Sequence, residues 1–288
     1  MESLPLDTMG HYMSDRWELH RMSSTRELAL TIERPAIKEA VLYGGLLYDS
    51  DVSVLLADSR RYATMSRDAS EQMFTIDPSD SRGNVNYLPA TLVEVKEAGA
   101  TLDSIGIHVN MITDSLGTEA SLKALSGKHI NLLHLATHGF YWTEKQVQAK
   151  NTKVRFLSAY RSQREEDRVM VRSGLLFTGA NAALNGQELP ANIDDGILTT
   201  REISTLDLRG LSLLVLSACQ TGLGDVKGDG VFGLQRGFKK AGAQSILMSL
   251  WSVDDEATHL LMTRFYDNLA AHMEKYDALR DAQRYVRG

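Results

Sequence analysis

The chain has 288 residues, 43% of them hydrophobic, which is enough apolar material for a full core in one large or two small domains. Its net charge of −6 and its scattered Lys and Arg residues argue against a dedicated nucleic-acid surface. The single cysteine, Cys219, excludes an internal disulfide and a cysteine-based zinc site. With no membrane-spanning apolar run and no N-terminal signal pattern, the sequence predicts a soluble, cytoplasmic protein.

The part of the chain up to Gly127 contains two predicted strands and two predicted helices. Residues 40–51 form a short apolar run with two glycines, which indicates a buried strand, and 106–113 alternate in the manner of a strand. Between them, Thr91 and Glu94 have the spacing of a capping box at the start of a helix. The second helix is expected to end at Gly127.

The rest of the chain repeats this alternation of strands and helices. Apolar runs at 130–137, 173–179, 211–218 and 243–251 predict buried strands, and two helical patterns occupy 230–243 and 254–273. Short apolar strands that alternate with helices predict an α/β fold, with a mostly parallel sheet and helices on both faces.

A polar, basic stretch at 143–172 interrupts this alternation and is predicted to be a surface insertion. A self-cleavage site, a loop that docks a partner and a simple solvated loop are all compatible with its composition. The simplest interpretation is the solvated loop.

Two predicted strands end in residues capable of chemistry. The run at 130–137 is followed by His138 and Gly139, and the run at 211–218 is followed by Cys219. Ligands and catalytic groups collect at the carboxyl ends of parallel strands, so neighbouring strands would bring the imidazole and the thiol together. The imidazole can then take the thiol proton, and Gly139 lets a backbone N–H approach a reacting carbonyl. His134, on the same face of a regular strand, is interpreted as a packed core histidine.

The glycine-rich stretch at 222–230 resembles a phosphate-binding loop only superficially. It lacks the Gly-Lys-Ser/Thr ending of such loops, so a flexible rim over the cleft explains its glycines better. We therefore expect neither a nucleotide nor any other cofactor, and no metal.

Several blocks, in order along the chain, resemble the motifs of CHAT domains. They read LLHLATHGF, RSGLLFTGAN, DGILTTREISTLDL, LLVLSACQTGLG and GDGVFGLQRGFKKAGAQSILMSLWSVDDEAT. CHAT domains are bacterial cysteine peptidases similar to caspases and separase, often attached to tetratricopeptide repeats. The resemblance implies a caspase-hemoglobinase fold with His138 as general base, Cys219 as nucleophile, and an oxyanion hole from the N–H groups of Gly139 and Cys219.

The resemblance also implies a domain organisation. Residues 88–288 match the catalytic core with its insertion at 143–172, and 1–87 match an N-terminal part whose start is expected to be truncated. CHAT domains carry further strands before Glu2 and after Val286, so we expect another segment or chain to cover the open sheet edges.

The SLWSVDDEAT block resembles a separase stretch whose acidic residue binds a basic side chain. This implies that Asp255 favours Arg or Lys before the cut bond, although Ser252 and Asp255 also have the spacing of a helix cap. The implied function is a cysteine endopeptidase acting on a protein or peptide, gated by a partner, effector or attached repeats in bacterial defence or regulation. The alternative is a latent or non-catalytic caspase-like interaction module. No contact with nucleic acid or membrane is expected.

Overall fold

The computed structural model describes residues 36–62, 84–141, 170–187, 189–190, 193–217, 228–248 and 255–287. All of them belong to one compact unit, Pro35–Gly288. Cys219, Ser252, most of the insertion at 143–172 and most of the glycine-rich stretch at 222–230 lie outside these residues.

Eight strands and eight helices are seen in the described part of the chain. The strands are β1 Glu39–Leu46, β2 His108–Asp114, β3 Leu132–Leu135, β4 Gly139–Tyr141, β5 Ser173–Leu176, β6 Ile197–Thr199, β7 Leu213–Leu216 and β8 Ser245–Met248. The helices are α2 Val52–Tyr62, α3 Pro89–Ser104, α4 Glu119–Lys123, α8 Ala180–Leu184, α9 Thr200–Ile203, α10 Gly228–Ala241, α11 Asp255–Ala270 and α12 Lys275–Arg287.

The main sheet has five parallel strands in the order β2-β1-β3-β7-β8. Its three inner strands are short apolar runs that are buried over almost their whole length, as expected for strands covered on both faces. Within the described residues, β2 and β8 form its two edges. The predicted α/β fold with a mostly parallel sheet is confirmed.

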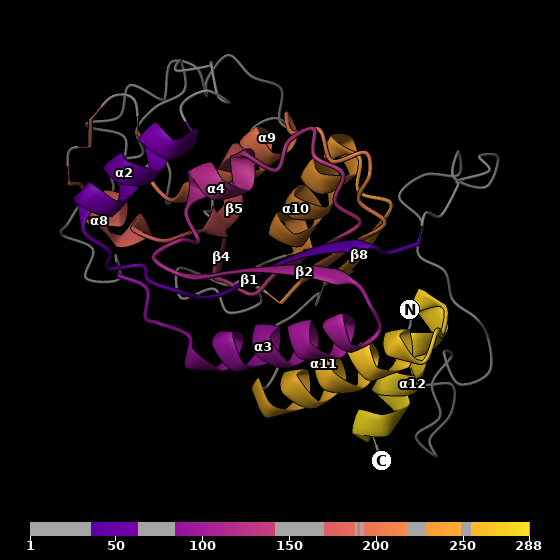
Figure 1. Cartoon of the computed structure of the whole chain (residues 1–288). Helices are drawn as coiled ribbons and strands as arrows, with labels where there is room; N and C mark the ends of the chain where they lie inside the picture. The colour runs from indigo at the N-terminus through magenta and orange to yellow at the C-terminus, as the bar shows by residue number, and fades with distance from the viewer. Residues whose placement is uncertain are drawn as a thin grey trace. The chain divides into compact units, whose positions relative to one another are not determined.

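Helices cover both faces of this sheet (Figure 1). Alternate strand residues face opposite sides, so Tyr43 and Leu135 join one core and Leu42 and Leu132 join the other. The first core is closed by α2, α4, α8, α9 and α10, and the second by α3 and α11, with α12 packed on α11. The predicted helices on both faces are therefore confirmed.

A second, three-stranded antiparallel sheet has the order β4-β5-β6 and was not predicted. Its strands are only three or four residues long, too short to give a recognisable sequence pattern. The apolar run at 173–179 therefore supplies a strand of this sheet and not of the main one. Met170, Val171 and Arg172, at the end of the predicted solvated insertion, are buried beside it, so that end of the insertion is not exposed.

The predicted capping box at Thr91 and Glu94 is wrong. Helix α3 begins at Pro89, which is pre-organised for the first helical position, and Leu88 is the cap residue. Thr91 lies inside the first turn, where its hydroxyl bonds the Leu88 carbonyl and accepts the Gly45 N–H. Glu94 is 9% exposed and its side chain turns into the protein, so it is not a surface cap.

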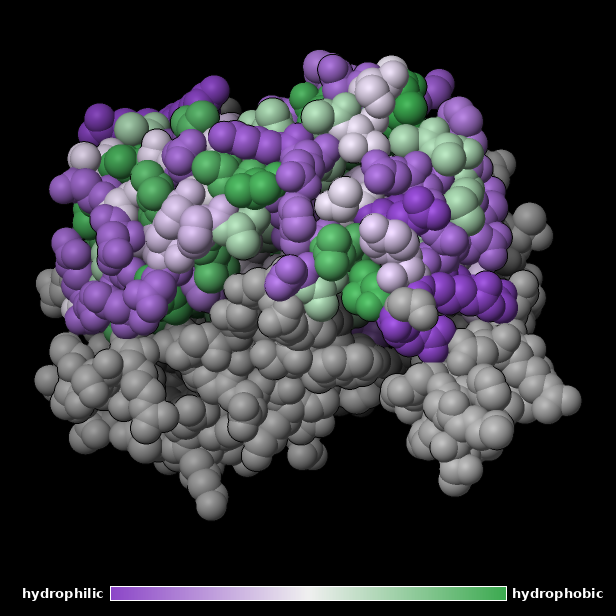
Figure 2. Space-filling model, turned by 90° about the horizontal axis from the view of Figure 1, so that it is seen from below, coloured by the Kyte–Doolittle hydropathy of each residue, from purple (hydrophilic) through white to green (hydrophobic). Residues whose placement is uncertain are grey.

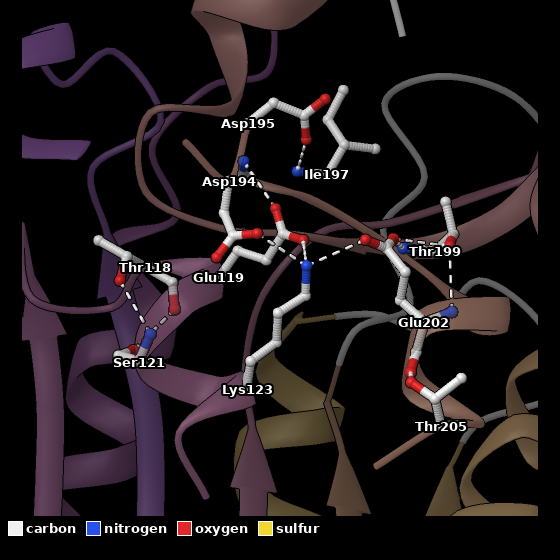
Figure 3. Close-up of polar contacts among 11 residues, drawn as sticks. Thr118, Glu119, Ser121, Lys123, Asp194, Asp195, Ile197, Thr199, Glu202 and Thr205 are labelled. Atoms are coloured by element: carbon white, nitrogen blue, oxygen red, sulfur yellow. Dashed lines mark hydrogen bonds and ion pairs between the residues drawn. The ribbon is translucent and has the colours of Figure 1, made fainter. Parts of the chain in front are cut away.

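Helix α4 is also shorter than predicted, because it ends at Lys123 and turns lead on to Gly127. At its end lies the Lys123 cluster, formed by Lys123, Glu119, Asp194 and Glu202 (Figure 3). The ammonium nitrogen of Lys123 lies 2.6 Å from Glu119, 2.8 Å from Asp194 and 3.0 Å from Glu202. The cluster joins α4 to α9 and to the segment before β6.

The side of the molecule formed by α3, α11 and α12 carries a mixed surface. Figure 2 shows hydrophilic residues over much of the described part of this face, with hydrophobic residues among them. Val93, Leu260 and Tyr285 are the large exposed apolar side chains on these three helices. Among the described helices, none has the length and apolarity needed to cross a membrane.

Candidate functional site

His138 lies where the chain leaves the main sheet. Strand β3 ends at Leu135 and β4 begins at Gly139, so Ala136, Thr137 and His138 carry the chain from one sheet to the other. The strand is therefore not regular from His134 to His138, and the expectation that both face the same side does not apply. His138 is 5% exposed.

The His138 ring contacts Asn86 and Tyr48. Its Nε2 atom lies 2.8 Å from the carbonyl oxygen of Asn86, and the ring of Tyr48 lies 4.9 Å away between centroids, tilted by 56°. A carbonyl oxygen can only accept, so in the neutral imidazole the proton sits on Nε2. Nδ1 is then the nitrogen that can accept a proton.

A chain of hydrogen bonds fixes the backbone around His138. The Thr137 hydroxyl donates to the carbonyl of Leu176, so the Tyr48 hydroxyl, 2.9 Å from the Thr137 oxygen, donates to Thr137. The Tyr48 oxygen in turn lies 3.4 Å from the backbone nitrogen of His138. Burial raises the pKa of Tyr48 to about 12, so its hydroxyl keeps its proton near neutral pH.

The N–H of Gly139 points away from β5. Gly139 pairs with Leu175, and the Leu176 N–H donates to the His138 carbonyl at 2.8 Å. Paired residues in an antiparallel ladder alternate between hydrogen-bonded and non-hydrogen-bonded positions, so Gly139 occupies a non-hydrogen-bonded one. Because β4 is the outer strand of the small sheet, the Gly139 N–H is directed to the side without a strand partner in the described structure.

The strand that precedes Cys219 lies beside the strand that precedes His138. Strand β7 pairs with β3 in parallel, with Leu216 opposite Leu135. His138 follows its paired residue by three positions (138 − 135) and Cys219 also follows by three (219 − 216). The N–H of Ser217 continues the pairing with the Leu135 carbonyl at 3.1 Å. Cys219 itself lies outside the described residues, so its contact with His138 stays a prediction.

His134 is a core histidine, as predicted. It is 0% exposed, and its ring stacks on Tyr266 with Nδ1 2.8 Å from the tyrosine hydroxyl. Its Nε2 lies 3.1 Å from Glu94 Oε1, without the alignment of a hydrogen bond. The other Glu94 oxygen accepts from the Ser217 hydroxyl at 2.9 Å. These four residues, here called the Glu94 cluster, join α3, β3, α11 and the end of β7.

Asp255 is the first residue of α11, and its side chain lies outside the described part of the structure. Its expected role toward a basic substrate residue is therefore a prediction that the structure leaves open. Among the described residues, no group of three or more His, Cys, Asp or Glu side chains is arranged to hold a metal ion.

The sequence analysis missed two groups near His138. Tyr48 follows the apolar run of β1, which neighbours β3, and an aromatic residue at that strand end was the available signal. Asn86 acts through its backbone carbonyl, which every residue type carries, so no sequence pattern indicates it.

One family model and two curated relatives match the chain. The model of the CHAT domain family matches residues 5–288. Tetratricopeptide repeat protein 28 of Mus musculus is 36% identical over 91 residues, and that of Homo sapiens is 36% identical over 90. Each match covers 31% of this chain and 4% of the relative, so the chain matches only a small part of these long proteins.

Proposed function

The chain belongs to the CHAT domain family, which is related to caspase-like cysteine peptidases, and on this basis we propose that it is a cysteine endopeptidase. Cys219 is the proposed nucleophile and His138 the general base, and Gly139 and Cys219 provide oxyanion N–H groups. In this proposal residues 88–288 form the catalytic core with its insertion at 143–172, and 1–87 form the N-terminal part of the same domain.

The pairing of β3 with β7 is the observation that carries this proposal. The two strands are adjacent and in register, and each proposed catalytic residue follows its strand by the same number of positions. Residues that follow neighbouring parallel strands by the same number of positions lie at the same edge of the sheet. The Asn86 carbonyl supports the role of His138, because it holds the proton on Nε2 and leaves Nδ1 to accept one.

The proposed reaction uses these groups in two stages. His138 Nδ1 takes the thiol proton as the Cys219 sulfur attacks the peptide carbonyl carbon, and the N–H groups stabilise the oxyanion. The C–N bond then breaks, His138 gives its proton to the leaving amine, and a thioester remains. Water attacks the thioester while His138 takes its proton, the C–S bond breaks, and the thiol and a carboxylic acid are released.

We propose a protein substrate cut after a basic residue, with Asp255 as the group that binds the Arg or Lys side chain. A carboxylate in a narrow pocket discriminates in this way because an unpaired buried charge is costly and a paired one is tolerated. The alternative role for Asp255 is that of an acidic residue at the start of α11, where it interacts favourably with the helix dipole.

Gating by a partner or effector is part of the proposal, since His138 is only 5% exposed and its surroundings must move to admit a peptide. The similarity to tetratricopeptide repeat proteins supports attached or associated repeats as the source of that signal. We place the activity in a bacterial defence or regulatory pathway, in the cytoplasm. The same burial favours the second candidate, a latent interaction module in which the dyad is closed.

Labelling of Cys219 separates the two candidates. A peptidyl acyloxymethyl ketone with Arg beside the reactive group is incubated with the parent chain and with the His138→Ala and Cys219→Ala variants. If the chain is a peptidase, the parent should be labelled and both substitutions should abolish the labelling. Labelling should also be weaker when Arg is replaced by Asp in the probe. Slow labelling that His138→Ala leaves unchanged would instead support the interaction module.

A further inference from the structure

Asn181 is a buried polar residue that reaches a distant segment of the chain. It is the second residue of α8, and it is 2% exposed. Its Oδ1 accepts the Val85 N–H at 2.9 Å, and its Nδ2 donates to the Val85 carbonyl at 3.0 Å. One side chain thus satisfies both backbone groups of Val85, as a neighbouring strand would.

Two further contacts fix the orientation of the Asn181 side chain and backbone. Nδ2 also donates to Asp49 Oδ1 at 2.6 Å, so the amide nitrogen faces the carboxylate. The backbone N–H of Asn181 donates to the carbonyl of Tyr48 at 3.0 Å. Asn181 therefore joins the segment after β1 to the segment before α3.

Both of these segments touch the His138 ring. Asn86, the residue after Val85, provides the carbonyl that accepts from His138 Nε2. Tyr48, whose carbonyl accepts the Asn181 N–H, provides the aromatic ring beside the imidazole. Asn181 is thus connected to the imidazole by two routes, one through Asn86 and one through Tyr48.

The turn before α8 is shaped to present Asn181 in this way. Gly179 adopts φ +83°, which favours glycine, and its N–H donates to the Leu47 carbonyl at 3.0 Å. A Cβ atom there would meet Leu55 at 2.8 Å. The same turn therefore forms backbone hydrogen bonds with Leu47 and, through Asn181, with Tyr48.

We infer that Asn181 is a positioning residue for His138: by clamping Val85 and Tyr48 it holds the Asn86 carbonyl against Nε2 and keeps Nδ1 as the proton acceptor. This inference rests on the proposed function for its catalytic consequence. Its structural part, the control of the imidazole proton by Asn181, does not.

The central variant is Asn181→Asp, which keeps the volume of the side chain and an acceptor for the Val85 N–H. It removes the donor to the Val85 carbonyl and sets a second carboxylate against Asp49. Adding Asp49→Asn places an amide donor opposite position 181 and restores the net charge of the parent. The double variant should therefore recover part of the reactivity and of the ring protonation pattern that the single variant loses. Asn185→Ala is the matched control, because the Asn185 side chain bonds Asn84 on the same segment at 2.5 Å, whereas the bonds to Val85 come from Asn181.

Two measurements are made on the full chain. The ¹⁵N shifts of the His138 ring report which nitrogen carries the proton, and labelling of Cys219 by the Arg-containing acyloxymethyl ketone reports reactivity. Asn181→Asp should shift the ring from a protonated Nε2 to a mixture of forms. It should lower the maximal labelling rate by about 10- to 100-fold, with little change in the probe concentration for half-maximal rate. The double variant should recover part of that rate, and Asn185→Ala should match the parent.

The outcomes separate the inference from the proposed function. A folded Asn181→Asp chain whose His138 ring shifts equal those of the parent would overturn the inference, whatever its labelling rate. A parent chain that never labels, while Asn181→Asp moves the ring shifts, would count against the peptidase and support the positioning role. If Asn181→Asp fails to fold, the Asp49→Ala single variant, which removes an acceptor of the Asn181 amide, must shift the ring, and an unchanged ring would again overturn the inference.

Discussion

Each side of the main sheet carries a polar cluster, partly buried at Lys123 and more deeply buried at Glu94, and the two are built on different principles. On the side of α4 and α9, the Lys123 cluster sets one ammonium group against three carboxylates within 3.0 Å (Figure 3). On the side of α3 and α11, the Glu94 cluster connects a carboxylate to a hydroxyl, an imidazole and a phenol. The first depends on charge balance, whereas the second depends mainly on neutral hydrogen-bonding groups.

This difference in composition is reflected in the pKa shifts of the two clusters. Burial raises the pKa of Glu119 well above its usual range, although Lys123 opposes this effect. Burial also acts to lower the pKa of Lys123, but the surrounding carboxylates, Glu119 first, raise it above its usual value. In the Glu94 cluster, burial and then the Glu94 charge raise the pKa of Tyr266, which keeps the phenol protonated and able to donate. Buried charges therefore stabilise only as a complete set, whereas neutral partners can be lost at smaller cost.

The largest test of this comparison removes the cation. Lys123→Met should lower the free energy of unfolding by about 3–5 kcal/mol at pH 7, because it leaves the buried Glu119 carboxyl group without its cation and beside two further carboxylates. Urea unfolding followed by circular dichroism measures the loss. Lys128→Met, on the exposed turn after the same helix, is the matched control and should change stability little. If the Lys123→Met chain is as stable as its control, the Lys123 cation does not stabilise the fold by balancing the three carboxylates.

The corresponding change on the other face should have a smaller effect. Tyr266→Phe removes the hydroxyl 2.8 Å from His134 Nδ1 and leaves that buried nitrogen without its hydrogen-bond partner. We expect a loss of about 1–3 kcal/mol in the same unfolding measurement, the usual cost of one unsatisfied buried polar group. Tyr285→Phe, at a side chain 60% exposed, serves as the control. The contrast between the faces is broken if Tyr266→Phe costs as much as Lys123→Met.

The predictability of the fold follows the length and composition of its strands. The strands of the main sheet are runs of four to eight residues, and the inner ones are almost wholly apolar, so their positions were evident along the chain. Strands β4 and β6 have three residues each and are specified by pairing with β5, which no local pattern reports. The helix start at Thr91 was misplaced because Pro89 begins the helix earlier. The true capping box is at Thr199 and Glu202, a Thr-x-x-Glu pattern that was overlooked.

The candidate site likewise contains groups that could be predicted from the sequence and groups that could not. His138 and Cys219 were identified because reactive side chains at strand ends are visible in the residue types. The Asn86 carbonyl and the clamp by Asn181 depend on backbone groups and on contacts across 96 residues. A backbone carbonyl carries no signal of residue type, and a contact between distant segments leaves no local sequence pattern, so only the fold reveals these groups.

The smallest predicted effect is a pH dependence of the folding stability, and it arises beside the Lys123 cluster. Burial raises the pKa of Asp195, beside the Lys123 cluster, from 3.8 to about 7, although the hydrogen bond from the Ile197 N–H opposes this. The folded state therefore binds this proton more tightly than the unfolded state. The resulting stability is fully present below about pH 4 and is lost as the pH rises to about 7.

Asp195→Asn should remove this dependence, since its amide oxygen still accepts from Ile197 and carries no charge. We expect the variant to exceed the parent by about 1–2 kcal/mol at pH 8, with the difference shrinking toward pH 5. Thermal unfolding between pH 5 and 8 measures both curves. Asp207→Asn is the control, because hydrogen bonds from Arg209 lower the pKa of this exposed carboxyl to about 2, so its contribution is constant over that range. Parallel curves for Asp195→Asn and its parent would mean that Asp195 stays ionised in the folded state throughout this pH range.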